Sequence, residues 1–171
     1  SYSVITTWGT DGIKYYVIDE WRSRVEYPDL EAAIKDCYAK HRPQALLIED
    51  AASGKAAIQT LRRTTSLPVI GRRPVGSKEI RAGLVAPLAE AGRVILPDGV
   101  AWTGDWIAEH VSFPNAANDD RVDTTSMALA YLREQVELVG VSEEYSGIEG
   151  RRVDESVRDP WWEEDHMDDD I

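Results

Sequence analysis

The chain has 171 residues, of which 43% are hydrophobic, which suffices for one domain with a hydrophobic core. A formal net charge of −12 argues against a protein that simply coats nucleic acid, and the single cysteine excludes a disulfide framework. No apolar run is long enough to span a membrane and the N-terminus lacks a signal-peptide pattern, so we expect a cytoplasmic protein.

The chain opens with a predicted β-hairpin. Residues 1–8 (SYSVITTW) alternate and are rich in β-branched and aromatic residues, as in a strand. Asp11-Gly12 is a strong turn signal, and residues 14–21 (KYYVIDEW) form the return strand. A helix is predicted over residues 30–41 from its apolar spacing.

The next strand ends in two carboxylates. Residues 45–48 (ALLI) form a short continuous apolar run, typical of a strand buried on both faces, and Glu49 and Asp50 follow directly. Open α/β sheets bind their ligands at this end of a strand. The alternative is that the two acids merely leave the core for water. A second helix is predicted over residues 55–63.

A basic cluster follows a strand at residues 67–70 (LPVI). It is the only dense group of cations in the chain and consists of Arg72, Arg73, Lys78 and Arg81. A solvated surface is the ordinary interpretation, and contact with a phosphate backbone is the sharper one. Ser77 is placed to cap a helix that runs to Ala91.

Residues 93–96 (RVIL) predict another strand, and a further helix carries Trp102, Trp106 and Ile107 along one face. Core packing explains these three residues better than base stacking does. His110 is interpreted as a packing or surface residue and not as a ligand.

Three acids then stand at the start of a helix predicted to reach about Val139. Asp119, Asp120 and Asp123 repel one another unless positive charge lies between them, and a divalent cation is a usual source of that charge. Asp120 and Asp123 share one helix face at i, i+3 spacing. A helix cap explains one aspartate but not three.

Beyond Gly140 the helical periodicity fails, and residues 142–150 are predicted to form a loop. We assign residues 1–140 to the folded domain and residues 141–171 to a flexible acidic tail that contains Trp161 and Trp162. Besides a solvated tail, the alternatives are a segment that covers the basic cluster in competition with DNA and one that docks on another subunit.

The predicted order, an antiparallel hairpin followed by parallel strands and a last helix, resembles the α/β RNase H-like fold with its mixed sheet. More narrowly, the chain resembles the nuclease domain of phage and prophage terminase large subunits. The matching words are SVITTWG, KYYVIDEWR, LLIEDAASG, PVGSKEIRA, AGRVILP, FPNAANDDRVD and MALAYL, and together they cover roughly residues 1–132.

In the family that the chain resembles, three acidic residues hold two Mg²⁺ or Mn²⁺ ions for phosphodiester hydrolysis, and the resemblance implies the same chemistry here. By position, the second family acid falls on Glu49, with Asp50 as the weaker choice, and the third on Asp120 or Asp123, with Asp119 beside them. These five residues form the implied metal site, and Glu49, Asp120 and Asp123 are the implied catalytic residues. The implied contacts to the DNA backbone are Lys55, Arg72, Arg73, Lys78 and Arg81.

Two departures from the family pattern stand out. Asn118 occupies the place of a usual histidine. The first family strand, which ends in the first acidic ligand and lies in the middle of the sheet, has no counterpart in the chain. Because a central slot left empty exposes unpaired backbone groups, we expect either a cut fragment or a substitute strand from Tyr145 to Val157 or from another subunit. With two of three acids, weak metal binding and poor cleavage are expected.

The leading hypothesis is therefore a metal-dependent endonuclease domain of a packaging terminase acting on double-stranded DNA. Its implied partners are the portal and the small terminase subunit, in the cytoplasm of a phage or prophage host. The alternatives are an RNase H-like domain that binds DNA or a partner without cutting, and a nuclease similar to Holliday-junction resolvases.

Overall fold

The computed structural model describes residues 2–51 and 53–149. The chain divides into two compact units, Ser1–Val136 and Glu137–Ile171, and the fold below is that of the first. The elements in chain order are β1 (Ser3–Thr10), β2 (Tyr15–Ser23), α1 (Tyr27–His41), β3 (Leu46–Glu49), α2 (Ser53–Thr64), β4 (Val69–Arg72), α3 (Lys78–Glu90), β5 (Val94–Ile95), α4 (Thr103–Ser112) and α5 (Asp120–Glu149).

The predicted hairpin is present, and the turn between its strands is organised by Asp11. Its Oδ1 accepts hydrogen bonds from the backbone N–H groups of Ile13 at 2.9 Å and Lys14 at 2.7 Å. The Tyr16 hydroxyl donates to Oδ2 at 2.9 Å. The next residue, Gly12, takes a φ of +89°, which a residue without Cβ adopts at little cost. The turn thereby sets the antiparallel register of β1 and β2.

These hydrogen bonds predict an acidic titration for Asp11. Backbone donation from Lys14, then from Ile13, lowers the pKa of Asp11 from 3.8 to about 2. Because the folded-state pKa is depressed, its contribution to stability is present above about pH 3.8 and is lost as pH falls toward 2. An NMR titration of the Asp11 side chain is expected to show a midpoint near 2, and a midpoint near 3.8 would contradict the turn geometry.

The described strands form two sheets. In the first, β2 pairs antiparallel with β1 and parallel with β5, which gives the order β1-β2-β5; in the second, β3 and β4 run parallel. The predicted α/β class with antiparallel and parallel strands is therefore confirmed, and the described residues also contain five helices.

Within residues 2–51 and 53–149, no strand pairs with the second edge of β1 or of β3. The predicted substitute strand from Tyr145 to Val157 is wrong as far as Glu149, because these residues belong to α5. The rest of that segment, residues 150–157, lies outside the described residues. A helix satisfies its own backbone donors and acceptors, so residues up to 149 need no sheet partner.

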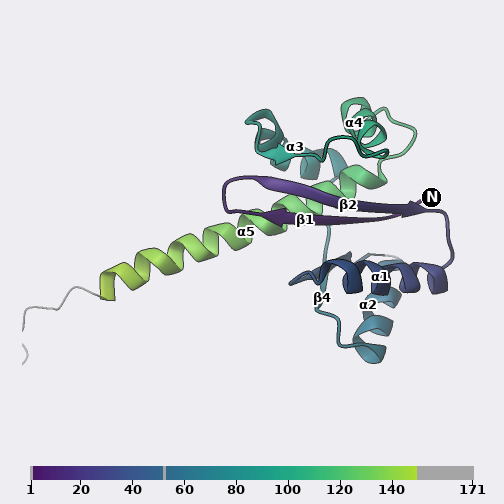
Figure 1. The fold of residues 1–171 in the computed structure, drawn as a ribbon, viewed down its shortest axis with the longest axis horizontal. Coiled ribbons are helices and arrows are strands. Elements are labelled where there is room, and N and C mark those ends of the chain that lie inside the picture. The colour runs from purple at the N-terminus through teal and green to yellow at the C-terminus, as the bar shows by residue number, and fades with distance from the viewer. Residues whose placement is uncertain (1, 52, 150–171) are drawn as a thin grey trace, which may run out of the picture. The chain divides into compact units, whose positions relative to one another are not determined.

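Two apolar cores lie against the hairpin. Figure 1 shows the hairpin with α3 and α4 on one side and α1 and α2 on the other. The α3 side is a cluster around Tyr15 and Leu129, each at most 2% exposed, and Trp8 packs against it. The α1 side is a cluster around Ile34 and the fully buried Leu61, which Ile5 joins from β1. Burial of both faces of the hairpin is what holds these elements together.

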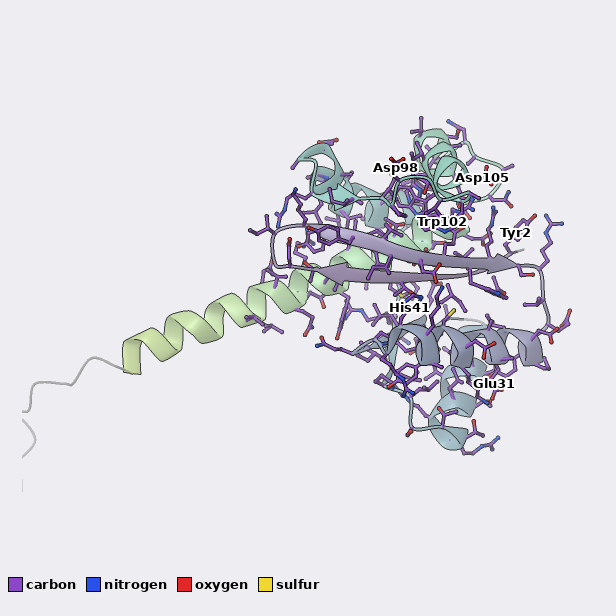
Figure 2. All side chains as sticks on the ribbon, viewed as in Figure 1. Tyr2, Glu31, His41, Asp98, Trp102 and Asp105 are labelled. Carbon is purple, nitrogen blue, oxygen red and sulfur yellow. The ribbon has the colours of Figure 1, made fainter. Side chains whose placement is uncertain are left out.

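An ionic contact also ties the hairpin to α1. Oδ2 of Asp19 in β2 lies 2.6 Å from Lys40 Nζ and 2.7 Å from His41 Nε2. Figure 2 labels His41 in the space between the hairpin and α1. Burial raises the pKa of Asp19, but the hydrogen bonds from Lys40 and His41 outweigh it, so the pKa lies below its usual value.

Other local predictions had mixed outcomes. Ser77 caps α3 as predicted, with its Oγ accepting from the Ile80 N–H at 3.3 Å. The common buried face of Trp102, Trp106 and Ile107 is wrong in part, since Trp106 is 7% exposed but Ile107 is 44% exposed.

The prediction that the last helix ends near Val139 is also wrong. α5 continues to Glu149, and the predicted loop at residues 142–150 is helical up to that residue. The stretch from Val139 to Glu149 has no proline, and each of its two glycines costs a helix only about 1 kcal/mol. The helix therefore continues although the apolar periodicity ends. No helix among the described residues has the length and apolar character needed to cross a membrane.

Candidate functional site

A cavity of about 270 Å³ brings together Glu49 from β3 and two acids from α5, Asp123 and Glu134. Glu49 is the last residue of β3, and Asp123 lies in the first turn of α5. Three basic residues of the predicted cluster, Arg72, Arg73 and Arg81, line the same cavity. The strand end and the helix start therefore share one site with most of the basic cluster.

The guanidinium of Arg81 lies between Glu49 and Asp123. Arg81 Nη2 is 2.7 Å from Asp123 Oδ1 and 4.0 Å from Glu49 Oε2. The Arg81 side chain is 19% exposed, and its Nη1 also donates to the carbonyl of Gly76 at 3.0 Å. The end of β3 and the first turn of α5 therefore both lie near the guanidinium of Arg81.

The other oxygen of Asp123 is held by Lys78. Lys78 Nζ lies 2.7 Å from Asp123 Oδ2 and 2.8 Å from Asp119 Oδ1. Burial lowers the pKa of Lys78, but the hydrogen bonds to Asp119 and Asp123 outweigh it and raise the pKa above its usual value. The ammonium therefore stays charged and neutralises part of the repulsion between the two aspartates.

The structure separates the remaining predicted acids from this cavity. Asp50 continues the β3–β4 ladder through its N–H, which donates to the Arg72 carbonyl at 2.9 Å, and its side chain lies beside Gly71. Neither Asp50 nor Asp120 lines the cavity. Of the five predicted metal ligands, Glu49 and Asp123 thus share a cavity, and Asp119 is linked to Asp123 through Lys78.

The predicted phosphate contacts are divided in the same way. Arg72 pairs with Glu134 at 2.7 Å, and its guanidinium lies 5.7 Å from the centre of the Tyr131 ring. Arg73 is exposed at the cavity wall, whereas the exposed Lys55 on α2 does not line the cavity. Arg72, Arg73 and Arg81 therefore remain together, and Lys55 does not join them.

Sequence reasoning missed a buried ionic network behind the site. Arg121 makes a two-pronged contact with Glu20 of β2, from Nε at 2.8 Å and Nη2 at 2.7 Å. Glu109 of α4 accepts from the Arg121 backbone N–H at 2.7 Å and from its Nη1 at 3.2 Å. The side chains of Arg121, Glu20 and Glu109 are 4%, 2% and 6% exposed.

This network anchors the first turn of α5, in which Asp123 lies, to β2 and α4. Hydrogen bonding to Glu20 raises the pKa of Arg121 above its usual value, so the guanidinium stays charged. A sequence signal existed for Glu109, which shares a helix face with Trp106 at i, i+3 spacing and is buried with it.

His110 belongs to packing, in line with its interpretation from the sequence. Its ring stacks on Trp106 with centroids 3.6 Å apart, and its Nε2 lies 2.9 Å from Thr125 Oγ1. Burial lowers the pKa of His110, which favours the neutral ring.

The residues present fit a divalent cation in kind. Carboxylate oxygens are the ligands that Mg²⁺ prefers, and Mg²⁺ is commonly held by one or two carboxylates with water and substrate phosphate. Glu49 and Asp123 could supply two such groups at one cavity. Within the part of the chain that the structure describes, no group of three or more acidic, histidine or cysteine side chains is placed to hold a metal ion.

Comparison with known proteins identifies the family of the chain. The family model of the Terminase RNaseH-like domain matches residues 2–132, which is more than three quarters of the chain. No curated protein and no solved structure matched the chain. The matched region contains Glu49, Asp123, the basic cluster and the buried network. The chain therefore belongs to the family of terminase RNase H-like domains.

Proposed function

We propose that this domain is the nuclease of a viral DNA-packaging terminase and cuts concatemeric double-stranded DNA by divalent-metal-dependent hydrolysis. The observation that carries the proposal is the shared cavity in which Glu49 and Asp123 lie beside Arg72, Arg73 and Arg81. Acids at the end of a strand and cations around them are what a phosphodiester backbone and a hard cation require together. The portal and the small subunit are the proposed partners, in the cytoplasm of the host cell.

In the proposed mechanism, Glu49 and Asp123 hold Mg²⁺ or Mn²⁺ through their carboxylate oxygens. When bound, the ion would activate a water and stabilise the leaving oxygen. Arg72 and Arg73 bind phosphates and orient the backbone without reading its sequence. The water oxygen forms a bond to phosphorus and the water gives up one proton, while one P–O ester bond breaks and the leaving oxygen takes up a proton. The involvement of a second ion stays a prediction.

The geometry favours Asp123 over Asp120, and this choice is open to test in the full chain. Plasmid nicking with Mn²⁺ is expected to fall about 100-fold or more in Glu49→Ala and Asp123→Asn, because each removes a ligand. Asp105→Asn, which removes an equal charge from the exposed face of α4, is the matched control and is expected to retain activity. An Asp123→Asn protein that nicks like Asp105→Asn would overturn the assignment.

A second candidate is a domain that binds DNA without cutting it. It is favoured by the ion pairs that occupy Asp119, Asp123 and Glu49 with side-chain cations. Nicking absent in the wild type, together with undetectable Mn²⁺ binding by titration calorimetry, would select this candidate. A preference for four-way junctions over linear duplex in the same assay would instead select a junction-resolving nuclease.

A further inference from the structure

We propose that Lys78 and Arg81 are internal counter-ions that exclude a divalent cation from Asp123 until DNA phosphates draw them away. The inference rests on the proposed function and concerns how the same site is regulated. It begins from the occupancy of one carboxylate: both oxygens of Asp123 are taken, Oδ1 by Arg81 and Oδ2 by Lys78, each at 2.7 Å.

The local charges explain why the counter-ions and a metal compete. Glu49, Asp119 and Asp123 place three negative charges around two positive side chains, so the ion pairs leave a single uncompensated negative charge. A divalent cation arriving at Asp123 would meet an ammonium and a guanidinium at contact distance. Like charges so close repel strongly at a partly buried site, so at least one of the two must leave.

The two counter-ions differ in how readily they can leave. Lys78 is 41% exposed, and the only hydrogen bonds of its ammonium among the described residues are to Asp119 and Asp123. Arg81 is 19% exposed and is also tied to the carbonyl of Gly76. A flexible lysine stem can carry its charge to a phosphate a few ångströms away. Lys78 is therefore the counter-ion that moves first.

DNA is the ligand that can draw Lys78 and Arg81 away from their carboxylate partners. Lys78 and Arg81 lie on α3, and Arg72, Arg73 and Arg81 line the adjoining cavity, so a backbone bound there brings phosphates to both counter-ions. Each phosphate contact made by Lys78 or Arg81 frees a carboxylate oxygen for the metal. By linkage, metal and DNA then strengthen each other's binding by the same factor. The site would therefore bind metal more weakly when no DNA is present.

The test measures Mn²⁺ affinity by titration calorimetry in the full chain. Lys78→Gln is expected to bind Mn²⁺ about 5-fold more tightly than wild type or better, because the competing charge is gone. Lys35→Gln, which removes an equal charge from the exposed side of α1, is the control and is expected to stay near wild type. A short duplex, with its own Mn²⁺ binding subtracted, is expected to tighten Mn²⁺ binding by wild type more than by Lys78→Gln.

A second readout needs no metal. With EDTA present, Asp119→Asn is expected to bind duplex DNA several-fold more tightly than Asp105→Asn, because only the former removes one of the two carboxylates that hold Lys78, while both change the net charge equally. Equal affinities would overturn the counter-ion inference.

The two proposals fail in different ways. Mn²⁺ affinity that is unchanged or weaker in Lys78→Gln but lost in Glu49→Ala would overturn the counter-ion inference and leave the nuclease proposal standing. Absence of Mn²⁺ binding in every variant would overturn both.

Discussion

Replacing Arg121 with methionine is expected to lower the free energy of unfolding by about 3–5 kcal/mol. The substitution roughly keeps the side-chain volume but leaves Glu20, at 2% exposure, without its guanidinium, and leaves Glu109, at 6% exposure, with the more distant Arg22 at 3.6 Å. Such charges cannot recover their hydration inside the fold, so removing one member of the network costs more than the pairing itself contributes. Urea unfolding followed by far-UV circular dichroism measures the loss.

Two further variants separate this cause from lost packing. Lys35→Met breaks the exposed pair with Glu31 on α1, where Lys35 is 48% exposed, and is expected to change stability by less than about 0.5 kcal/mol. Adding Glu20→Met to Arg121→Met removes the carboxylate that is left without a cation, while Glu109 keeps Arg22, and is expected to restore much of the stability. An Arg121→Met loss below about 1 kcal/mol would show that the two glutamates do not depend on the arginine.

Gly54→Ala is the second substitution with a large expected effect, about 3 kcal/mol of destabilisation. A Cβ on Gly54 would lie 1.9 Å from the carbonyl oxygen of Glu49 and 3.1 Å from its carbonyl carbon. These are backbone atoms, so the start of α2 and the end of β3 must move apart. Because that end carries Glu49, Mn²⁺ binding is expected to weaken together with stability.

Gly83→Ala provides the matched control for this effect. Gly83 lies within α3, and a Cβ there meets nothing within 4 Å. The same substitution is expected to stabilise the domain by about 0.4–1 kcal/mol, because alanine restricts the unfolded chain. Urea midpoints of the two variants should therefore move in opposite directions. A Gly54→Ala midpoint at or above that of wild type would contradict the close approach of α2 to β3.

Local chemistry predicted much of this domain. Residues 1–21 alternate around an Asp-Gly turn, and the hairpin is present with Asp11 at its centre. Ser77 could be predicted as a helix cap because capping is a local contact, in which its hydroxyl oxygen accepts from the N–H of Ile80 three residues later. The acid at the end of a short apolar strand, Glu49, and the acids at the start of α5 were also predicted, because strand ends and helix starts can be recognised within a few residues.

Predictions from local patterns were wrong where one sequence pattern is compatible with more than one structure. The stretch after Gly140 lost its apolar periodicity, yet α5 continues to Glu149, because a helix needs backbone hydrogen bonds and not an apolar face. Ile107 fits an apolar stripe, but it is 44% exposed. Which apolar residues are buried depends on what packs against their helix.

The sequence by itself determined the types of most elements, the acidic ends of β3 and α5, and the family. Tertiary structure alone decided that Asp123, and not Asp120, shares a cavity with Glu49, and that Lys78 and Arg81 pair with acids. Lys78 and Asp119 are 41 positions apart in the chain, and Arg81 and Asp123 are 42 apart. Arg121 and Glu20 are 101 positions apart. A local pattern extends over a turn or a strand, whereas pairing between distant charges depends on which faces the packed cores bring together.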